Sequence, residues 1–67
     1  MEKNIMQQIW KELLKLDELP GLNESFFELG GNSFIASKVC QMFYSKCGKE
    51  IEIADFYEHE TIEELLG

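Results

Sequence analysis

The stretch FFELGGNSFIASKV, residues 26 to 39, sets two glycines and an asparagine directly before a serine, where an apolar helix-like pattern begins. Gly30 and Gly31 permit backbone angles that other residues resist, and they leave space for another molecule to approach. On local physics alone, the simplest role for Ser33 is the N-cap of the helix that follows. The alternative is a hydroxyl displayed for chemistry, because the free N–H groups and positive dipole at a helix start favour an anion such as a phosphate diester.

The helix that Ser33 opens is predicted to run to Cys47 and to stop at Gly48. Its apolar face consists of Ile35, Ala36, Val39, Cys40, Phe43 and Cys47. Phe34 breaks this pattern by projecting among polar positions, so we expect an exposed aromatic ring beside Ser33 with a role in docking. Cys40 and Cys47 lie two helical turns apart, roughly 10 Å, which is too far for a disulfide. We therefore expect them to pack as small hydrophobic residues.

Before this stretch, residues Lys3 to Leu16 form a predicted amphipathic helix, because their apolar side chains fall on one half of the helical wheel. Residues Asp17 to Gly31 show no sustained period and are predicted to be a long connecting loop. Within it, Ser25 to Glu28 has capping-box spacing and could form one short turn. That turn would place Phe26 or Phe27 as a plug over the core.

After the helix that ends at Cys47, polar and apolar residues alternate from Lys49 to Ile53, as in a strand. Because no partner strand is predicted, we expect an extended loop with Ile51 and Ile53 turned inward. Ala54 to Glu58 is predicted as a single helical turn that buries Phe56. Capping-box spacing and an apolar stripe predict a short final helix at Thr61, Ile62, Glu64, Leu65 and Leu66. The sequence thus predicts an all-α domain with three main helices and one short helix.

Length and charge limit the possible functions. A chain of 67 residues allows one small domain, residues 1–67. The net charge of −7 is divided into −3 over residues 1–32, +3 over residues 33–49 and −7 over residues 50–67. An acidic chain repels phosphates, which argues against nucleic-acid binding. No long apolar segment or signal-peptide pattern appears, so we expect a cytoplasmic protein that does not bind membranes. We also expect it to be a monomer.

Autonomous catalysis is not expected from these residues. A hydrolase elbow needs glycine two residues after its serine, and that position holds Ile35. The single histidine, His59, lies far along the chain among acidic residues and is expected at the surface. Cysteine and histidine are too few and wrongly spaced for a zinc site, and no phosphate-binding P-loop is present.

Taken together, three blocks of the chain resemble the phosphopantetheine-dependent carrier proteins, specifically the peptidyl carrier (thiolation) domains of nonribosomal peptide synthetases. The blocks are IW at residues 9–10, FFELGGNS at residues 26–33 and ADFYEHETIEEL at residues 54–65. They occur in the family's order and at suitable spacing over nearly the whole chain. The resemblance implies a small four-helix bundle of the acyl or peptidyl carrier type.

The resemblance also implies a role for Ser33. A phosphopantetheinyl transferase would attach the 4′-phosphopantetheine arm of coenzyme A to it, and the arm would carry aminoacyl or peptidyl groups as thioesters. The domain would then be a non-catalytic substrate of adenylation, condensation and thioesterase-type enzymes in a nonribosomal peptide or hybrid peptide–polyketide pathway. Magnesium would belong to the transferase. By the same resemblance, partners would dock on Asn32, Phe34, Ile35 and Lys38.

The chain departs from the family pattern at three positions, where Asn32 replaces the common Asp or His, Phe34 the common leucine and Glu60 a frequent proline. Its second helix is basic, which favours the synthetase type over the acidic recognition helix of fatty-acid carriers. Two alternatives stay open. One is an acyl carrier of a polyketide or fatty-acid-like system, and the other is an unmodified helical module that binds partners through Phe34 and the acidic C-terminal segment.

Overall fold

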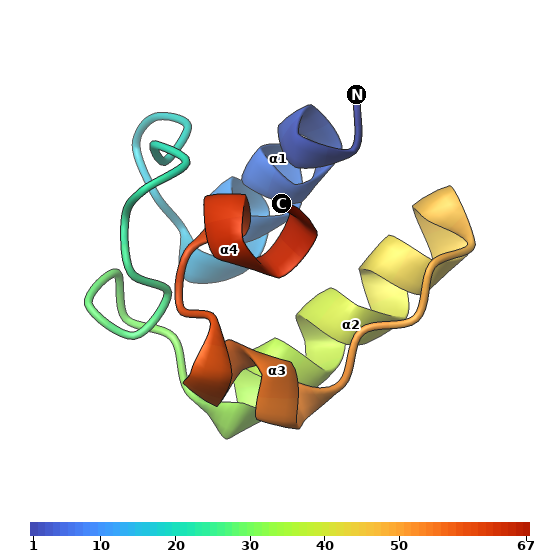
Figure 1. Cartoon of the computed structure of the whole chain (residues 1–67). Helices are drawn as coiled ribbons and strands as arrows, with labels where there is room; N and C mark the ends of the chain where they lie inside the picture. The colour runs from blue at the N-terminus through green and yellow to red at the C-terminus, as the bar shows by residue number, and fades with distance from the viewer.

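The computed structural model describes all 67 residues and is entirely helical, without strands. Its four helices are α1 (Glu2–Leu14), α2 (Ser33–Cys47), α3 (Ile53–Glu58) and α4 (Ile62–Leu66) (Figure 1). The predicted all-α class and the number of helices are confirmed. The lengths differ from the expected three main helices and one short helix, because α3 and α4 have six and five residues and both are short. None of the helices has the length and apolar character needed to cross a membrane.

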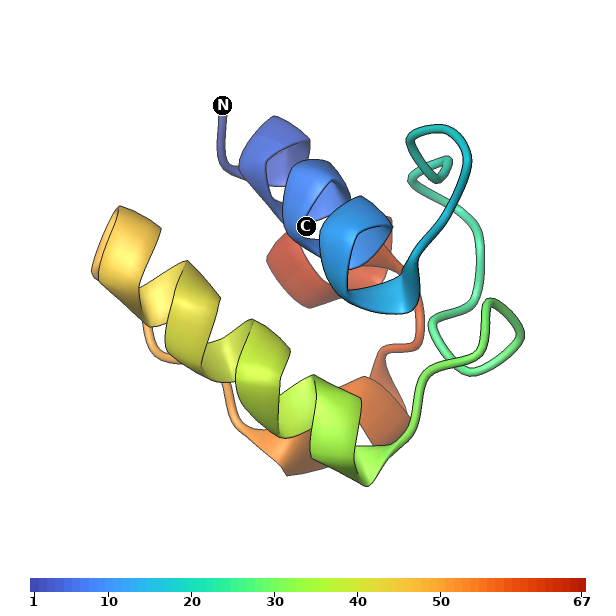
Figure 2. The ribbon, with the colours of Figure 1, turned by 180° about the vertical axis from the view of Figure 1, so that it is seen from behind.

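The two long helices, α1 and α2, pack against each other and run in roughly opposite directions. The short helix α4 packs against α1, and α3 packs against α2. The loop from Lys15 to Asn32 descends along one side of the molecule to join the end of α1 to the start of α2 (Figure 2). This arrangement brings α3 beside the N-terminal half of α2, where Ser33 lies.

The core combines side chains from all four helices and from the long loop. Its fully buried members are Met6, Ile9, Trp10, Phe26, Ala36, Val39, Phe43, Phe56 and Ile62. Phe26 lies between Trp10 and Phe56, with ring centroids 5.0 and 4.7 Å away. Such aromatic pairs contribute about 0.5–1.5 kcal/mol beyond the area they bury. The prediction that a phenylalanine of this loop covers the core is therefore confirmed, and that residue is Phe26.

The first helix ends two residues earlier than the wheel predicted. Lys15 adopts a left-handed backbone with φ of 57°, and it closes α1 after Leu14. The N–H of Leu16 then donates to the carbonyl of Lys11 at 3.0 Å, in the pattern of a Schellman motif. Leu16 is half-buried but lies outside the helix.

Hydrogen bonds join the long loop to the C-terminal part of the chain, and no sequence pattern predicts them. The N–H of Phe26 donates to the carbonyl of Glu60 at 2.8 Å, and the N–H of Glu63 donates to the carbonyl of Leu22 at 3.0 Å. The hydroxyl of Ser25 also donates to the Glu60 carboxylate at 2.8 Å. These bonds set the loop against the segment between α3 and α4, so the turn before Ser33 has a fixed support.

The connection after α2 is extended and contains no strand, as predicted. Ile51 is half-buried and packs against the core. The inward placement of Ile53 is wrong, because Ile53 is the first residue of α3 and its side chain is 38% exposed. The reason lies in the start of that helix, where the Asp55 carboxylate accepts the N–H of Glu52 at 3.0 Å and Phe56 takes the buried position.

Both cysteines are free thiols, half-buried and packed against the core, as the spacing predicted. Burial raises the pKa of the Cys40 thiol, and the nearby negative charges of Asp55 and Glu52 raise that pKa further. Because the thiolate is the reactive form, Cys40 is a poor nucleophile and serves as a packing residue.

Candidate functional site

Ser33 is an exposed side chain at the first position of α2, and it is not the residue that caps the helix. The cap is Asn32, which has an extended backbone and whose Oδ1 accepts the N–H of Ile35 at 2.9 Å. The role of Ser33 as N-cap, favoured by local physics, is therefore wrong. Asparagine and serine are nearly equal as caps, and their order along the chain decides which one fills the position. The Ser33 hydroxyl is left free for other contacts.

The two residues before Asn32 are both glycine, each for a different structural reason. Gly30 has a φ of +105°, a conformation that side-chain-bearing residues rarely adopt. Gly31 lies flat against the Phe26 ring, and an added Cβ would overlap the ring carbons. The sequence suggests that these glycines leave room for another molecule near Ser33. In the structure, Gly30 allows the chain to turn and Gly31 leaves room for the Phe26 ring.

The Ser33 hydroxyl has one side-chain hydrogen-bond partner, the hydroxyl of Tyr57 on α3, at 2.5 Å between the two oxygens. The Tyr57 ring packs against Phe27 with centroids 4.9 Å apart. Tyr57 is not among the site residues predicted from the sequence, although a weak signal for it exists. With Phe56 buried, the next residue of a short helix must point about 100° away around the axis, so Tyr57 is directed outward.

The residues predicted to bind partners lie on the first turns of α2. Phe34 is 70% exposed, and the Lys38 ammonium sits 5.0 Å from the centre of its ring, in cation–π geometry. Ile35 is half-buried and packs against the core, so part of its surface serves stability. Asn32 is exposed, yet its side-chain oxygen is engaged in the cap. The structure thus presents Phe34 and Lys38 most openly.

The start of α2 suits a group that carries negative charge. No acidic residue lies in the first turn, and the helix dipole places partial positive charge there. Ser33 supplies an exposed oxygen to which a phosphate can be joined, and the cap leaves that oxygen unoccupied by the backbone. The residues present therefore fit a phosphopantetheine group held through Ser33.

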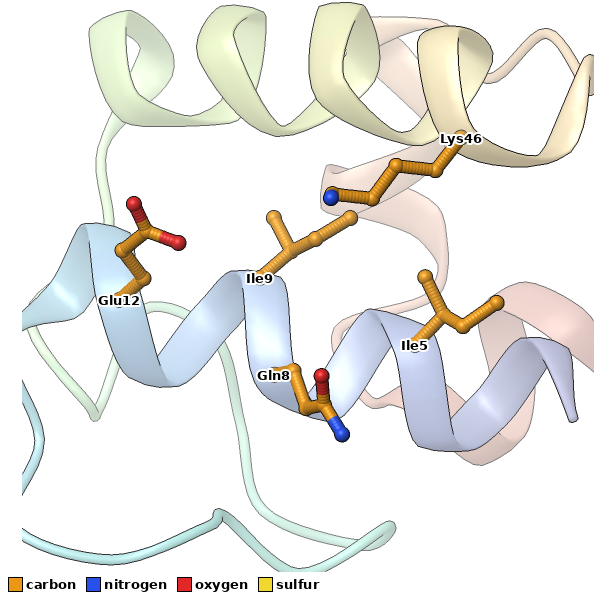
Figure 3. A pocket seen from close by; sticks show the side chains of 5 residues that line it. All are labelled: Ile5, Gln8, Ile9, Glu12 and Lys46. Carbon is orange, nitrogen blue, oxygen red and sulfur yellow. The ribbon is translucent and has the colours of Figure 1, made fainter.

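None of the three hollows on the surface contains Ser33. Figure 3 shows the hollow between α1 and α2, which measures 310 Å³. Its lining side chains are Ile5, Gln8, Ile9, Glu12 and Lys46. Lys46 lies 13 residues beyond Ser33 on α2, a separation of about 20 Å along the helix axis. The site around Ser33 is a surface feature without a substrate cavity, and the only hydrogen-bond partner of the serine side chain is Tyr57 and not His59.

Comparisons with known proteins agree with this geometry. Residues 4–67 match the family model described as "Phosphopantetheine attachment site". A plipastatin synthase chain of Bacillus subtilis (strain 168) is 41% identical over 63 residues, which cover 94% of this chain. Nonribosomal peptide synthetase 30 of Fusarium vanettenii is also 41% identical over 63 residues, or 92% of the chain. The chain spans 2% and 1% of the length of these two relatives.

Solved structures show the same fold. BlmI, a type-II acyl carrier protein from Streptomyces verticillus involved in bleomycin biosynthesis, has a TM-score of 0.84 and 30% identity, covering 96% of this chain and 76% of BlmI. Holo T3CT has a TM-score of 0.82 at 24% identity over 98% of this chain and 94% of its own, a likeness of fold alone.

The fold and the site define a carrier-type domain, a class whose members are generally non-catalytic. The chain belongs to the phosphopantetheine attachment site family. Its cofactor is accordingly a covalently attached 4′-phosphopantetheine.

Proposed function

We propose that residues 1–67 are a single carrier domain that holds aminoacyl or peptidyl groups on a phosphopantetheine arm attached to Ser33. The domain shuttles these groups between enzymes of a nonribosomal peptide or hybrid peptide–polyketide pathway. The observation that carries the proposal is the exposed Ser33 hydroxyl at the start of α2, which the Asn32 cap leaves free. The relatives support the pathway, since they include plipastatin synthase and a nonribosomal peptide synthetase.

Attachment requires only an accessible oxygen from this chain. The Ser33 Oγ forms a bond to the pantetheine-bearing phosphorus of coenzyme A, the diphosphate bond breaks, and 3′,5′-adenosine bisphosphate leaves with the electron pair. The serine proton passes to a base of the transferase. Once bound, the arm supplies a terminal thiol that carries the acyl group as a thioester. Burial and a raised thiol pKa make Cys40 a weak nucleophile, so we do not expect it to be acylated itself.

The partners in this proposal are a phosphopantetheinyl transferase and adenylation, condensation and thioesterase-type enzymes. They would approach the first turns of α2, where Phe34 and Lys38 are exposed and Asn32 and Ile35 border Ser33. The domain itself catalyses no reaction and works as a monomer. Its use of coenzyme A as arm donor suits a cytoplasmic location.

The test is an intact-mass measurement after incubation with coenzyme A and a broad-specificity phosphopantetheinyl transferase. We expect wild-type protein to gain one phosphopantetheine and Ser33→Ala to gain none. Ser37→Ala is the matched control, since Ser37 lies one turn further along α2 and is half-buried. An unchanged wild-type mass would contradict the carrier function, and a gain that persists in Ser33→Ala would move the attachment site.

An acyl carrier of a polyketide or fatty-acid-like system is the second candidate, and the likeness to the type-II acyl carrier BlmI favours it. Loading separates the two. The arm-bearing protein is offered to amino-acid adenylation enzymes and, separately, to acyltransferases with malonyl-coenzyme A. Aminoacylation supports the peptide pathway, whereas exclusive malonylation supports the acyl carrier.

A further inference from the structure

The contact between Ser33 and Tyr57 joins two helices at the attachment position. The two hydroxyl oxygens lie 2.5 Å apart, and either can be the donor because serine and tyrosine hydroxyls both donate and accept. The residues are 24 apart in sequence, so the bond depends on the packing of α3 against α2. It is the only hydrogen bond that the Ser33 side chain makes.

The Tyr57 hydroxyl is held in place although the residue is 57% exposed. Its ring packs on Phe27, and the Phe27 ring meets Phe26 edge-on with centroids 5.4 Å apart. Phe26 in turn is fully buried beside Phe56, which anchors α3. An unbroken series of aromatic contacts thus runs from the core to the phenol oxygen next to Ser33.

We propose that Tyr57 is a positioning residue of the attachment site, whose hydroxyl orients the Ser33 side chain before modification and donates a hydrogen bond to the phosphodiester afterwards. This inference rests on the proposed function of Ser33. It assigns to α3 a polar contact with the base of the arm, in addition to its part in the core.

The chemistry of the phosphodiester fixes the direction of the later bond. Modification removes the hydroxyl proton of Ser33 and places oxygens that can only accept beside the phenol. Tyr57 is then the donor, and a hydrogen bond to a charged oxygen is roughly twice as strong as one between neutral groups. Asp55 is the acidic residue two positions before Tyr57 on α3. Its carboxylate already accepts the N–H of Glu52, so it has a hydrogen-bond partner other than the phenol.

The protein contains two tyrosines, Tyr57 and Tyr44, and Tyr44 serves as a control for substitution of Tyr57. Tyr44 is similarly exposed, at 59%, but lies 11 residues after Ser33 on α2, about 16 Å along the axis. Tyr57→Phe removes one oxygen and keeps the ring on Phe27. Tyr44→Phe removes the same oxygen far from the site.

The first measurement is the phosphorus-31 NMR shift of the modified protein, folded and in urea. We expect the folded wild type to differ from the unfolded chain, Tyr57→Phe to move toward the unfolded value, and Tyr44→Phe to match the wild type. Circular dichroism confirms that both variants fold. A phosphorus shift of Tyr57→Phe identical to that of wild type would overturn the inference.

The second measurement uses the Tyr44→Phe background, in which Tyr57 is the single tyrosine, labelled with carbon-13 at Cζ. We expect its signal to shift when Ser33→Ala removes the partner hydroxyl, and to shift again when the arm is added to Ser33. A signal that moves in neither case would refute the contact. Absence of any mass gain with the transferase would instead refute the proposed function, so the two failures are distinguishable.

Discussion

Phe26 and Phe34 lie eight residues apart in one stretch of sequence and behave in opposite ways. Phe26 is fully buried between Trp10 and Phe56, whereas Phe34 is 70% exposed and touches the ammonium of Lys38. Phe26 fills the core and supports the turn, with Gly31 packed against its ring. Around Ser33, the side chains of Asn32, Phe34 and Lys38 are exposed at the start of α2, whereas Ala36 on the other side of the helix is buried. Core packing and the exposed attachment position therefore lie in adjoining segments, so substitutions should affect stability and modification separately.

The largest expected effect comes from the buried ring of Phe26. Phe26→Ala should destabilise the domain by about 3–5 kcal/mol, the usual cost of removing a buried phenylalanine. A small domain has total stability near the lower end of about 5–15 kcal/mol, so much of the variant should be unfolded. Urea denaturation followed by circular dichroism measures this. Phe34→Ala is the partner variant, and a similar loss in both would contradict the division.

Gly31→Ala should also destabilise the domain, by about 1–3 kcal/mol, because the new Cβ must displace the Phe26 ring in a packed core. Gly21→Ala is the matched control, since its Cβ would meet only the Glu24 side chain, at an ordinary 3.7 Å. Thermal melting compares the two. Equal melting temperatures would show that Gly31 is not needed for the Phe26 packing.

Asn32→Ala tests which residue caps α2. Loss of the cap should cost about 1 kcal/mol, whereas Asn32→Asp should retain most of the stability because aspartate is an equally good cap. Ser33→Ala should change stability by less than about 0.5 kcal/mol, because the side chain is exposed and water can replace its one hydrogen bond, to Tyr57. If Ser33→Ala proves the more destabilising in urea titrations, the cap assignment is wrong.

A small effect on stability is also expected for Phe34. Phe34→Ala should alter the free energy of unfolding by about 0.5–1 kcal/mol at most, the strength of an exposed cation–π contact. Its effect should appear instead in the transferase reaction, as a roughly fivefold rise in KM, or about 1 kcal/mol of lost contact. Tyr44→Ala, an exposed aromatic at the far end of α2, should leave KM unchanged. Equal KM values for both variants would remove Phe34 from the docking surface.

Much of the fold follows from the sequence because helical periodicity is a local property. The faces of α1 and α2, the Phe26 plug and the cap at Thr61 all appear as spacing patterns, and the cap is confirmed by the Glu64 N–H that Thr61 accepts at 3.1 Å. The end of α1 at Leu14 is not predictable, because the left-handed backbone of Lys15 that closes the helix carries no sequence signal. The alternation of residues 49–53 wrongly predicts an inward Ile53, because the helix α3 starts at that residue.

The site was predictable in part. Ser33 stands out because glycines, asparagine and serine occur together before an apolar helix. Asn32 and Ser33 are adjacent and both favour caps, so local rules could not decide between them. Tyr57 contacts Ser33 across 24 residues, and the backbone bonds from Phe26 to Glu60 are independent of side-chain type. Such contacts arise from tertiary packing, which cannot be predicted from the spacing of residues within one helix.

Because Asn32 caps α2, the Ser33 hydroxyl is free, and we propose that it carries the phosphopantetheine. The most direct measurement is peptide-level mass spectrometry of wild-type protein after modification with coenzyme A and a transferase. The chain contains four serines, Ser25, Ser33, Ser37 and Ser45, and fragmentation assigns the added mass to one of them. We expect the added phosphopantetheine on Ser33 alone. Its presence on another serine, or its absence from every peptide, would show that Ser33 is not the attachment site.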